Sequence, residues 1–174
     1  MPARTIRAAL LTAAAFAPFG RVLEAGGHAS TANQGRAERF DTALDLATHD
    51  ARASRLHSAV YRIAQSSLPF TVTVIERHPL SPQLFYPNSG AGFLVCACPV
   101  RTDGEPDLSA LQAFIGTRAQ GIVWNAGVWH SPLAALGENA DFLMLQWQCG
   151  GPLDCEERHL PVAISVAGPA ARDA

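Results

Sequence analysis

The sequence predicts a mainly β fold, an antiparallel barrel or sandwich, on the basis of three observations. Short apolar or alternating runs recur along the 174 residues, turns containing Gly and Pro separate these runs, and helical periodicity is scarce. Apolar residues make up 48% of the chain and charged residues 16%, a balance typical of a globular protein. Because no internal repeat is visible, we expect a single domain over residues 1–167 and a disordered tail over residues 168–174.

The clearest strand covers residues 68–80, where β-branched residues alternate with others until Pro79 stops the run. Further strands are expected at residues 19–25, 58–64, 83–87, 93–100, 121–130, 141–148 and 160–167, and residues 28–40 are expected to form a loop or an irregular strand. A short internal helix is expected at residues 108–114, with Asp107 as its N-cap. Among barrels and sandwiches, a cupin-like double-stranded jelly roll is the best single match, and such barrels enclose a ligand cavity.

Residues 4–17 allow two interpretations. Arg4 and Arg7 precede an apolar, alanine-rich run, which is typical of a secretory signal peptide. The same run also predicts a short N-terminal helix with Thr12 as its N-cap and an end before Pro18. The run is about ten residues long, too short to span a bilayer, so no membrane partner is expected. Composition alone leaves both interpretations open.

Charge and cysteine content exclude several classes of function. The net charge is −2 and the basic residues are scattered, so nucleic acid is not an expected partner. All 13 basic residues are arginines, which excludes Schiff-base chemistry through a lysine amine. The four cysteines are too few for a disulfide framework, and Cys96 and Cys98 point to one face of a strand. We interpret these two as buried apolar side chains and predict no metal site.

Two polar residues at the end of the clearest strand are candidate catalytic groups. Glu76 and His78 share a face with Val72 and Val74, so alternation predicts that both point inward. A buried carboxylate and a buried imidazole are costly unless they are paired or used in chemistry. The alternative is a solvated ion pair with Arg77 at the barrel mouth.

Two more inward residues are predicted by the same argument on other strands. His130 shares its face with Ile122, Trp124 and Val128, which also fits an ordinary core histidine. Arg62 shares its face with Val60, and its guanidinium is suited to gripping a carboxylate at two points. A surface ion pair is the alternative for Arg62.

Several segments together resemble one enzyme family. The segments are LTAAAFAPFGRVLE (11–24), NQGRAERF (33–40), ERHPLSPQLFYP (76–87) and GVWHSPL (127–133), and they are similar in order and spacing to the ureidoglycolate lyase family. The resemblance favours the N-terminal helix over a signal peptide. It implies a cytoplasmic homodimer with a cupin-like barrel that splits (S)-ureidoglycolate, a small-molecule substrate, into glyoxylate and urea during allantoin degradation. No cofactor is required by this resemblance, although a divalent metal stimulates some members.

Site residues are inferred from residue type and position, because the resemblance retains polar positions without saying which of them touch the substrate. Catalysis is assigned to Glu76, His78 and His130, and substrate binding to Asn33, Arg39, Arg62, Gln83 and Asn125. Breaking the C–N bond of a hemiaminal needs a base at the hydroxyl and an acid at the departing urea. We expect Glu76 or His78 to be the base and His130 to be the acid. Arg62 with Arg39 would hold the carboxylate, and Gln83 with Asn33 would bind the ureido group.

Three departures from the family pattern leave other functions open. Asn125 stands where the family usually has a histidine, Ser131 replaces a second histidine, and the neutral stretch at residues 146–151 lacks a usual arginine. The alternatives are a lyase or hydrolase acting on a related hydroxy or ureido acid, and a non-catalytic cupin that binds a small molecule.

Overall fold

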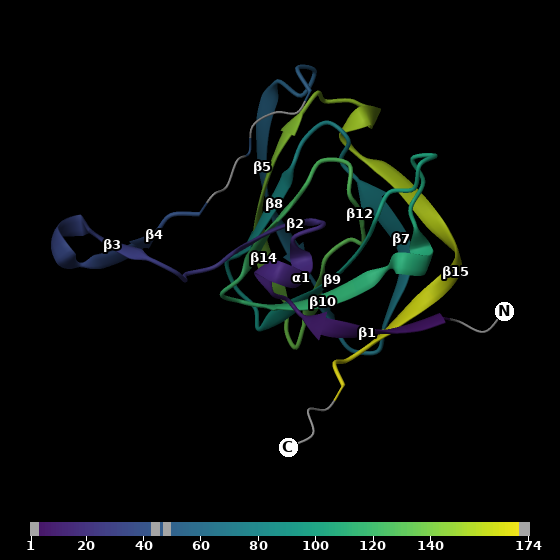
Figure 1. Cartoon of the computed structure of the whole chain (residues 1–174), viewed down its shortest axis with the longest axis horizontal. Coiled ribbons are helices and arrows are strands. Elements are labelled where there is room, and N and C mark those ends of the chain that lie inside the picture. Colours follow the sequence, from purple (N-terminus) through teal and green to yellow (C-terminus); the bar gives the residue numbers. More distant parts are fainter. Residues whose placement is uncertain (1–3, 43–45, 47–49, 171–174) are drawn as a thin grey trace.

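The computed structural model describes residues 4–42, 46 and 50–170, and the chain is mainly β (Figure 1). One sheet has the strand order β10 (Gln112–Thr117), β1 (Arg4–Leu10), β15 (Glu156–Ala167), β7 (Phe70–Arg77), β12 (Trp129–His130), β9 (Gly92–Cys98), β13 (Ala134–Leu136) and β6 (Gln65–Ser66). A second sheet has the order β2 (Gly20–Leu23), β11 (Gly121–Trp124), β8 (Gln83–Pro87), β14 (Ala140–Gln148) and β5 (Arg55–Ile63). Because β9 also pairs with β10, the first sheet closes into a ring. The predicted barrel is confirmed.

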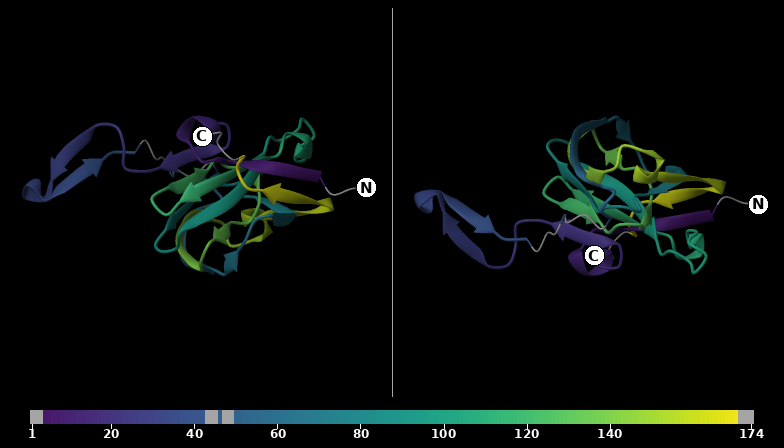
Figure 2. Two further views of the ribbon diagram at one scale, coloured as in Figure 1. Left: turned by 90° about the horizontal axis from the view of Figure 1, so that it is seen from below. Right: turned by 90° about the horizontal axis from the view of Figure 1, so that it is seen from above.

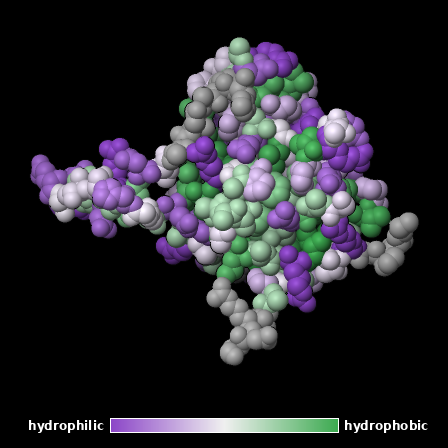
Figure 3. All heavy atoms as spheres, in the orientation of Figure 1, coloured by the Kyte–Doolittle hydropathy of each residue, from purple (hydrophilic) through white to green (hydrophobic). Residues whose placement is uncertain are grey.

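Residues 28–40, expected to be a loop or an irregular strand, form a separate hairpin of β3 (Ala29–Ala32) and β4 (Ala37–Phe40). A 3-10 turn, η1 (Asn33–Gly35), lies at its tip. The hairpin projects sideways from the barrel in every view (Figures 1 and 2), and its surface is mostly polar (Figure 3). We call residues 29–40 the arm.

The N-terminal segment is part of the domain. Residues 4–10, where no strand was predicted, form β1, which runs parallel to both β10 and β15, whereas the sequence predicted an antiparallel barrel. The predicted helix is confirmed as α1 (Ala13–Phe16), and the Thr12 hydroxyl caps it by accepting a hydrogen bond from the Ala15 amide at 3.2 Å. Phe16 at its end is fully buried and anchors the segment to the barrel.

The expected internal helix at residues 108–114 is wrong. Asp107 does cap a turn, but this turn is the short 3-10 helix η2 (Leu108–Ala110), and the chain then enters β10. Ala113 and Phe114 are both buried there, because β10 pairs with β9 on one side and β1 on the other. Long-range pairing therefore outweighs a weak local helix preference.

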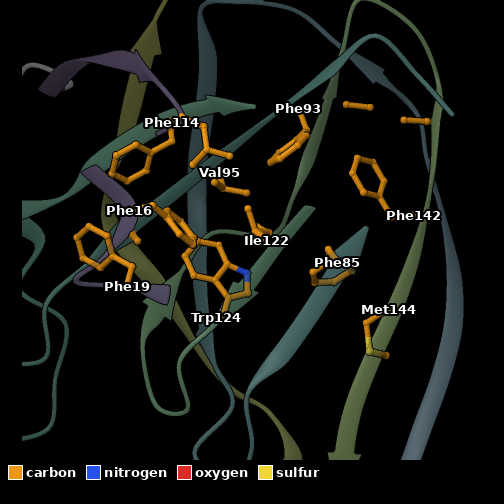
Figure 4. Packing of buried hydrophobic residues seen from close by; sticks show 14 residues of the cluster. Phe16, Phe19, Phe85, Phe93, Val95, Phe114, Ile122, Trp124, Phe142 and Met144 are labelled. Carbon is orange, nitrogen blue, oxygen red and sulfur yellow. The ribbon is translucent and has the colours of Figure 1, made fainter. Parts of the chain in front are cut away.

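The core has two large clusters, and a small third cluster contains Leu23, Leu84 and Val123. One lies between the sheets and is rich in aromatic rings, with Phe16, Phe114 and Trp124 at one end and Phe142 and Met144 at the other (Figure 4). The second fills the closed ring and includes Cys96 and Cys98, both fully buried on one face of β9 as predicted. Phe85, a member of the first cluster, also lines the cavity described next.

The expected continuous strand at residues 121–130 is wrong. A turn over residues 125–128, with Gly127 at φ 78°, separates β11 from β12. Residues 168–170 follow β15 without helix or strand, and the rest of the predicted tail lies outside the described residues. Within the described chain, no helix has the length and apolarity that a membrane crossing requires.

Candidate active site

A cavity of about 380 Å³ opens between the two sheets. Its volume is near the lower end of the roughly 300–1,000 Å³ common for small-molecule sites. The lining residues come from strands of both sheets and from the turn before β15: Tyr61, Ile63, Glu76, His78, Gln83, Phe85, Pro132, Leu133, Gln146, Gln148, Asp154, Cys155 and Glu157. Three residues singled out from the sequence, Glu76, His78 and Gln83, are among them.

The pairing of β7 and β12 brings the catalytic candidates together. His130 on β12 is the direct cross-strand partner of Glu76 on β7. The His130 Nε2 atom lies 3.7 Å from Glu76 Oε1, and the His78 Nε2 atom lies 4.0 Å from the same oxygen. The structure therefore gathers Glu76, His78 and His130 around one point; Glu76 and His78 line the cavity, whereas the buried His130 is not among its lining residues.

Glu76 and His78 face the cavity for a reason that differs from the predicted one. Strict alternation placed Val72 and Glu76 on one face, yet Val72 and Ile75 both pack inside the closed ring. The pairing of β7 with β15 shifts register between His159 and Ile164, and this irregularity breaks the alternation. Since Ile75 points into the ring, its neighbour Glu76 points to the opposite side, toward the cavity.

Both imidazoles have a fixed tautomer. The Nδ1 atom of His78 is 2.7 Å from the backbone oxygen of Asp154, and that of His130 is 2.9 Å from the oxygen of Val128. A carbonyl oxygen can only accept, so each Nδ1 carries the proton and donates it. Each Nε2 atom consequently presents a lone pair toward Glu76, and neither has a hydrogen-bond partner among the described residues.

Burial determines the charge states of this cluster. Burial raises the pKa of the Glu76 carboxyl above its usual range, and the nearby negative charge of Glu157 raises it further. Burial lowers the pKa of His78, and burial together with the proximity of His78 lowers the pKa of His130 to about 3. Both imidazoles are therefore neutral at physiological pH, and Glu76 is the group suited to exchanging a proton.

A pair of glutamines adds a further acceptor to the cavity. The Gln83 amide nitrogen donates to Gln146 Oε1 at 3.1 Å, and the Gln146 amide nitrogen donates to the Asp154 backbone oxygen at 3.1 Å. This leaves Gln83 Oε1 buried and without a partner in the described chain. Sequence reasoning missed Gln146, although it shares the inward face of β14 with the buried residues Phe142 and Met144.

The turn before β15 is held by one carboxylate. The Asp154 side chain accepts hydrogen bonds from the backbone amides of Cys149, Gly150 and Gly151 at 2.7, 2.7 and 3.1 Å. Although burial opposes ionisation, these hydrogen bonds outweigh it and lower the Asp154 pKa. Sequence reasoning did not assign a role to this residue, yet its backbone oxygen orients His78.

The expectation that Arg62 points into the barrel is wrong. Its side chain is 80% exposed and makes a bidentate ion pair with its cross-strand partner Asp141 at 2.8 and 2.9 Å. On β5 the neighbouring residues Tyr61 and Ile63 line the cavity, so Arg62 lies on the outer face. Val60, its predicted inward companion, is also exposed.

The other expected binding residues lie away from the cavity. Asn125 is exposed in the turn after β11 and does not line the cavity. Asn33 and Arg39 are exposed on the arm, where Arg39 pairs with Asp41 at 2.6 Å. Within a single chain, none of the three is in the same site as Glu76.

Glu76, His78 and His130 are chemically suited to holding a divalent cation, a role that the sequence did not assign to them. One ligand atom each from Glu76, His78 and His130 lies within 4.8 Å of the others. Two imidazole nitrogens and a carboxylate are a common ligand set, and backbone oxygens that fix the far ring nitrogens are typical second partners of metal-binding histidines. The unpartnered Nε2 lone pairs fit this role.

Comparison with known proteins shows the family of this chain. The profile of the ureidoglycolate lyase family matches residues 3–167. Ureidoglycolate lyase from Mesorhizobium japonicum is 38% identical over 164 residues, covering 92% of this chain and 96% of that protein. The protein of the same name from Burkholderia mallei is 36% identical over 162 residues, covering 92% of each. The chain belongs to the ureidoglycolate lyase family.

Similarity to solved structures is weaker. A dTDP sugar isomerase from Desulfovibrio desulfuricans G20 aligns with a TM-score of 0.47 and 14% identity, covering 83% of this chain and 86% of that one. Assignment to the ureidoglycolate lyase family therefore depends on the sequence matches, which span nearly the whole chain.

Proposed function

We propose that this member of the ureidoglycolate lyase family cleaves ureidoglycolate to glyoxylate and urea in the cavity around Glu76. The observation that carries the proposal is a set of three buried acceptor atoms without partners in the described chain: His78 Nε2, His130 Nε2 and Gln83 Oε1. Ureidoglycolate is rich in donors, with one hydroxyl and three ureido N–H groups. A buried acceptor without a partner costs roughly 1–3 kcal/mol, and a donor-rich substrate would remove this cost.

In the proposed mechanism, Glu76 moves the proton. Its carboxylate accepts the proton of the substrate hydroxyl, and the oxygen then forms the carbonyl of glyoxylate as the C–N bond breaks. The electron pair of that bond passes to the urea nitrogen, which takes the same proton back from Glu76. The raised pKa of Glu76 suits a group that must both accept and return a proton, and such transfers contribute roughly 10²–10⁴-fold to the rate.

The two histidines act as acceptors in this scheme. The role of acid was predicted for His130, but its imidazole has its only proton on Nδ1, where Val128 accepts it. The pKa of His130, lowered to about 3, also leaves no second proton to give at neutral pH. We therefore assign His78 and His130 to holding the hydroxyl and ureido N–H groups against Glu76, and Gln83 to the far end of the ureido group.

We propose that no cofactor is required and that a divalent metal stimulates the reaction. Such an ion would be held by Glu76, His78 and His130, where it would take the Nε2 lone pairs in place of the substrate's donors, and it would supply charge stabilisation for an oxygen of the substrate. We also propose a cytoplasmic location, which is consistent with the four free cysteines, and a homodimeric assembly.

The direct test is turnover by the purified protein. Incubation with ureidoglycolate is expected to release glyoxylate and urea in equal amounts. A panel of related hydroxy and ureido acids addresses the second candidate function, which is favoured by the neutral Gln146 and Gln148 on the cavity wall. Faster turnover of another acid would show that this acid, and not ureidoglycolate, is the substrate. Ligand-induced thermal stabilisation without turnover would show that the protein binds the ligand and does not catalyse its cleavage.

A further inference from the structure

The cavity carries negative charge without a balancing guanidinium. Its ionisable side chains include three carboxylates, those of Glu76, Asp154 and Glu157, and none of the described lining residues is an arginine. The chain has no lysine, and Arg62 lies on the outer face of β5. Ureidoglycolate is itself an anion, so repulsion would oppose its entry into this cavity. When no cation is held by Glu76, His78 and His130, a positive group from outside the cavity wall would offset this repulsion.

The arm is an isolated element. Its two strands pair only with each other, and none of its residues is buried. A lone two-stranded hairpin is marginally stable in water, so it is expected to pack against another surface. The arm points away from its own barrel in each of the three ribbon views (Figures 1 and 2), which directs it toward a neighbouring molecule.

The tip of the arm presents a guanidinium. Arg36 follows the turn η1, in which Asn33 and Gln34 have positive φ angles of 50° and 59°. Its Nε atom donates to the Asn33 backbone oxygen at 3.3 Å, and in the described part of the chain Arg36 makes no ion pair. Arg39 lies farther from the tip and pairs with Asp41. Within the described part of the chain, Arg36 is therefore the basic residue of the arm without an ion pair, and the arm's one acidic residue, Glu38, lies in β4 rather than in the turn at the tip.

We propose that the arm of one copy docks on a second copy of this chain and places Arg36 at the mouth of that copy's cavity. There the guanidinium faces the Glu157 carboxylate and binds the carboxylate of the substrate. Charge complementarity between the tip and the carboxylate-lined cavity is the reason for choosing a second copy as the docking partner. This proposal rests on the proposed function for the identity of the anion, but the docking of the arm does not.

Mixing two variants tests the exchange of arms. Glu76→Gln disables the cavity and leaves the arm intact, whereas Arg36→Glu reverses the charge of the arm and leaves the cavity intact. Each homodimer is expected to lose activity. Equal amounts unfolded together and refolded should recover about one quarter of the wild-type activity, because half of the dimers are mixed and each has one complete site. Arg36→Lys should retain part of the activity.

Two outcomes would overturn the proposal. Wild-type activity in Arg36→Glu would show that the Arg36 guanidinium does not contribute to the site. No gain of activity on mixing the two variants would show that the arm does not act between copies.

Crosslinking gives a readout that is independent of turnover. One chain carries Arg36→Cys and another carries Glu157→Cys, both in a Cys149→Ser, Cys155→Ser background. A short bismaleimide is expected to crosslink the mixture into a covalent dimer far more efficiently than either chain alone. Crosslinking without turnover of ureidoglycolate by the wild type would refute only the proposed function. Turnover without crosslinking, or a monomeric protein in sedimentation, would refute only the docking of the arm.

Discussion

The indole ring of Trp124 stacks on the imidazole ring of His130, with centroids 4.4 Å apart and planes inclined by 15°. Trp124 ends β11 in one sheet, and His130 lies in β12 of the other. The stack therefore connects the aromatic core to the cavity wall, and together with the hydrogen bond to Val128 it fixes the ring that faces Glu76.

Removing this stack should affect both stability and rate. Trp124→Ala is expected to cost about 3–5 kcal/mol of folding free energy, a fall in Tm of roughly 6–20 °C. Trp124→Phe retains a ring and should cost less, while kcat falls because His130 is held less firmly. Thermal unfolding and steady-state kinetics measure the two effects. An unchanged kcat in a folded Trp124→Phe variant would show that stacking does not position His130.

The glutamine pair should contribute to recognition of the substrate. Gln83→Leu removes an acceptor from the cavity and leaves Gln146 Oε1 without its donor, so kcat/KM is expected to fall roughly 5- to 150-fold, equivalent to 1–3 kcal/mol. Gln112→Leu, at an exposed position on β10, is the matched control and should behave as the wild type. Equal kinetics for both variants would remove Gln83 from the substrate site.

Thiol labelling reports the charge of Glu76. Burial, followed by the negative charges of Glu76 and Glu157, raises the pKa of Cys155 to about 12, so at pH 8 only about one thiol in ten thousand is ionised. Both Cys149 and Cys155 are exposed, but iodoacetamide should modify Cys149 first because of the raised Cys155 pKa, and the Cys155 rate should rise about tenfold per pH unit. Glu76→Gln should lower the Cys155 pKa and speed its labelling.

Mass spectrometry of the labelled protein measures these rates. Cys96 and Cys98, whose pKa values burial raises to about 12, serve as the unreactive controls. Labelling of Cys155 as fast as Cys149, or at the same rate with and without Glu76, would contradict the proposed coupling.

The sequence predicted a mainly β barrel, and it also predicted the inward position of Glu76 and His78, although the alternation used for that second prediction breaks within β7. It failed where a single residue of register decides the face. On β5, an edge strand, both Val60 and Tyr61 are exposed, so hydrophobic alternation gave no safe indication of the side that Arg62 occupies. On β7 the register shift with β15 also breaks the alternation, so the inward position of Glu76 did not follow from the pattern that predicted it.

Other features depend on contacts that no local pattern reveals. The cavity charge follows from Asp154 and Glu157, which long-range pairing of β15 with β7 brings beside Glu76. The arm was recognisable only as a polar stretch, because none of its residues is buried and its strands therefore lack the alternation of apolar and polar residues that predicts a strand. Gln146, by contrast, could have been found, since it is a polar residue on the apolar face of β14.

The central claim is that Glu76, in the shared cavity, moves the proton that releases urea. The most direct measurement compares kcat/KM for ureidoglycolate in Glu76→Gln and Arg62→Ala, with folding of both verified by circular dichroism. We predict a loss of roughly 10²-fold or more for Glu76→Gln, because the amide cannot accept the proton. Arg62→Ala, on the outer face, should stay within about twofold of the wild type, since a surface ion pair contributes little. Full activity in Glu76→Gln would contradict the account.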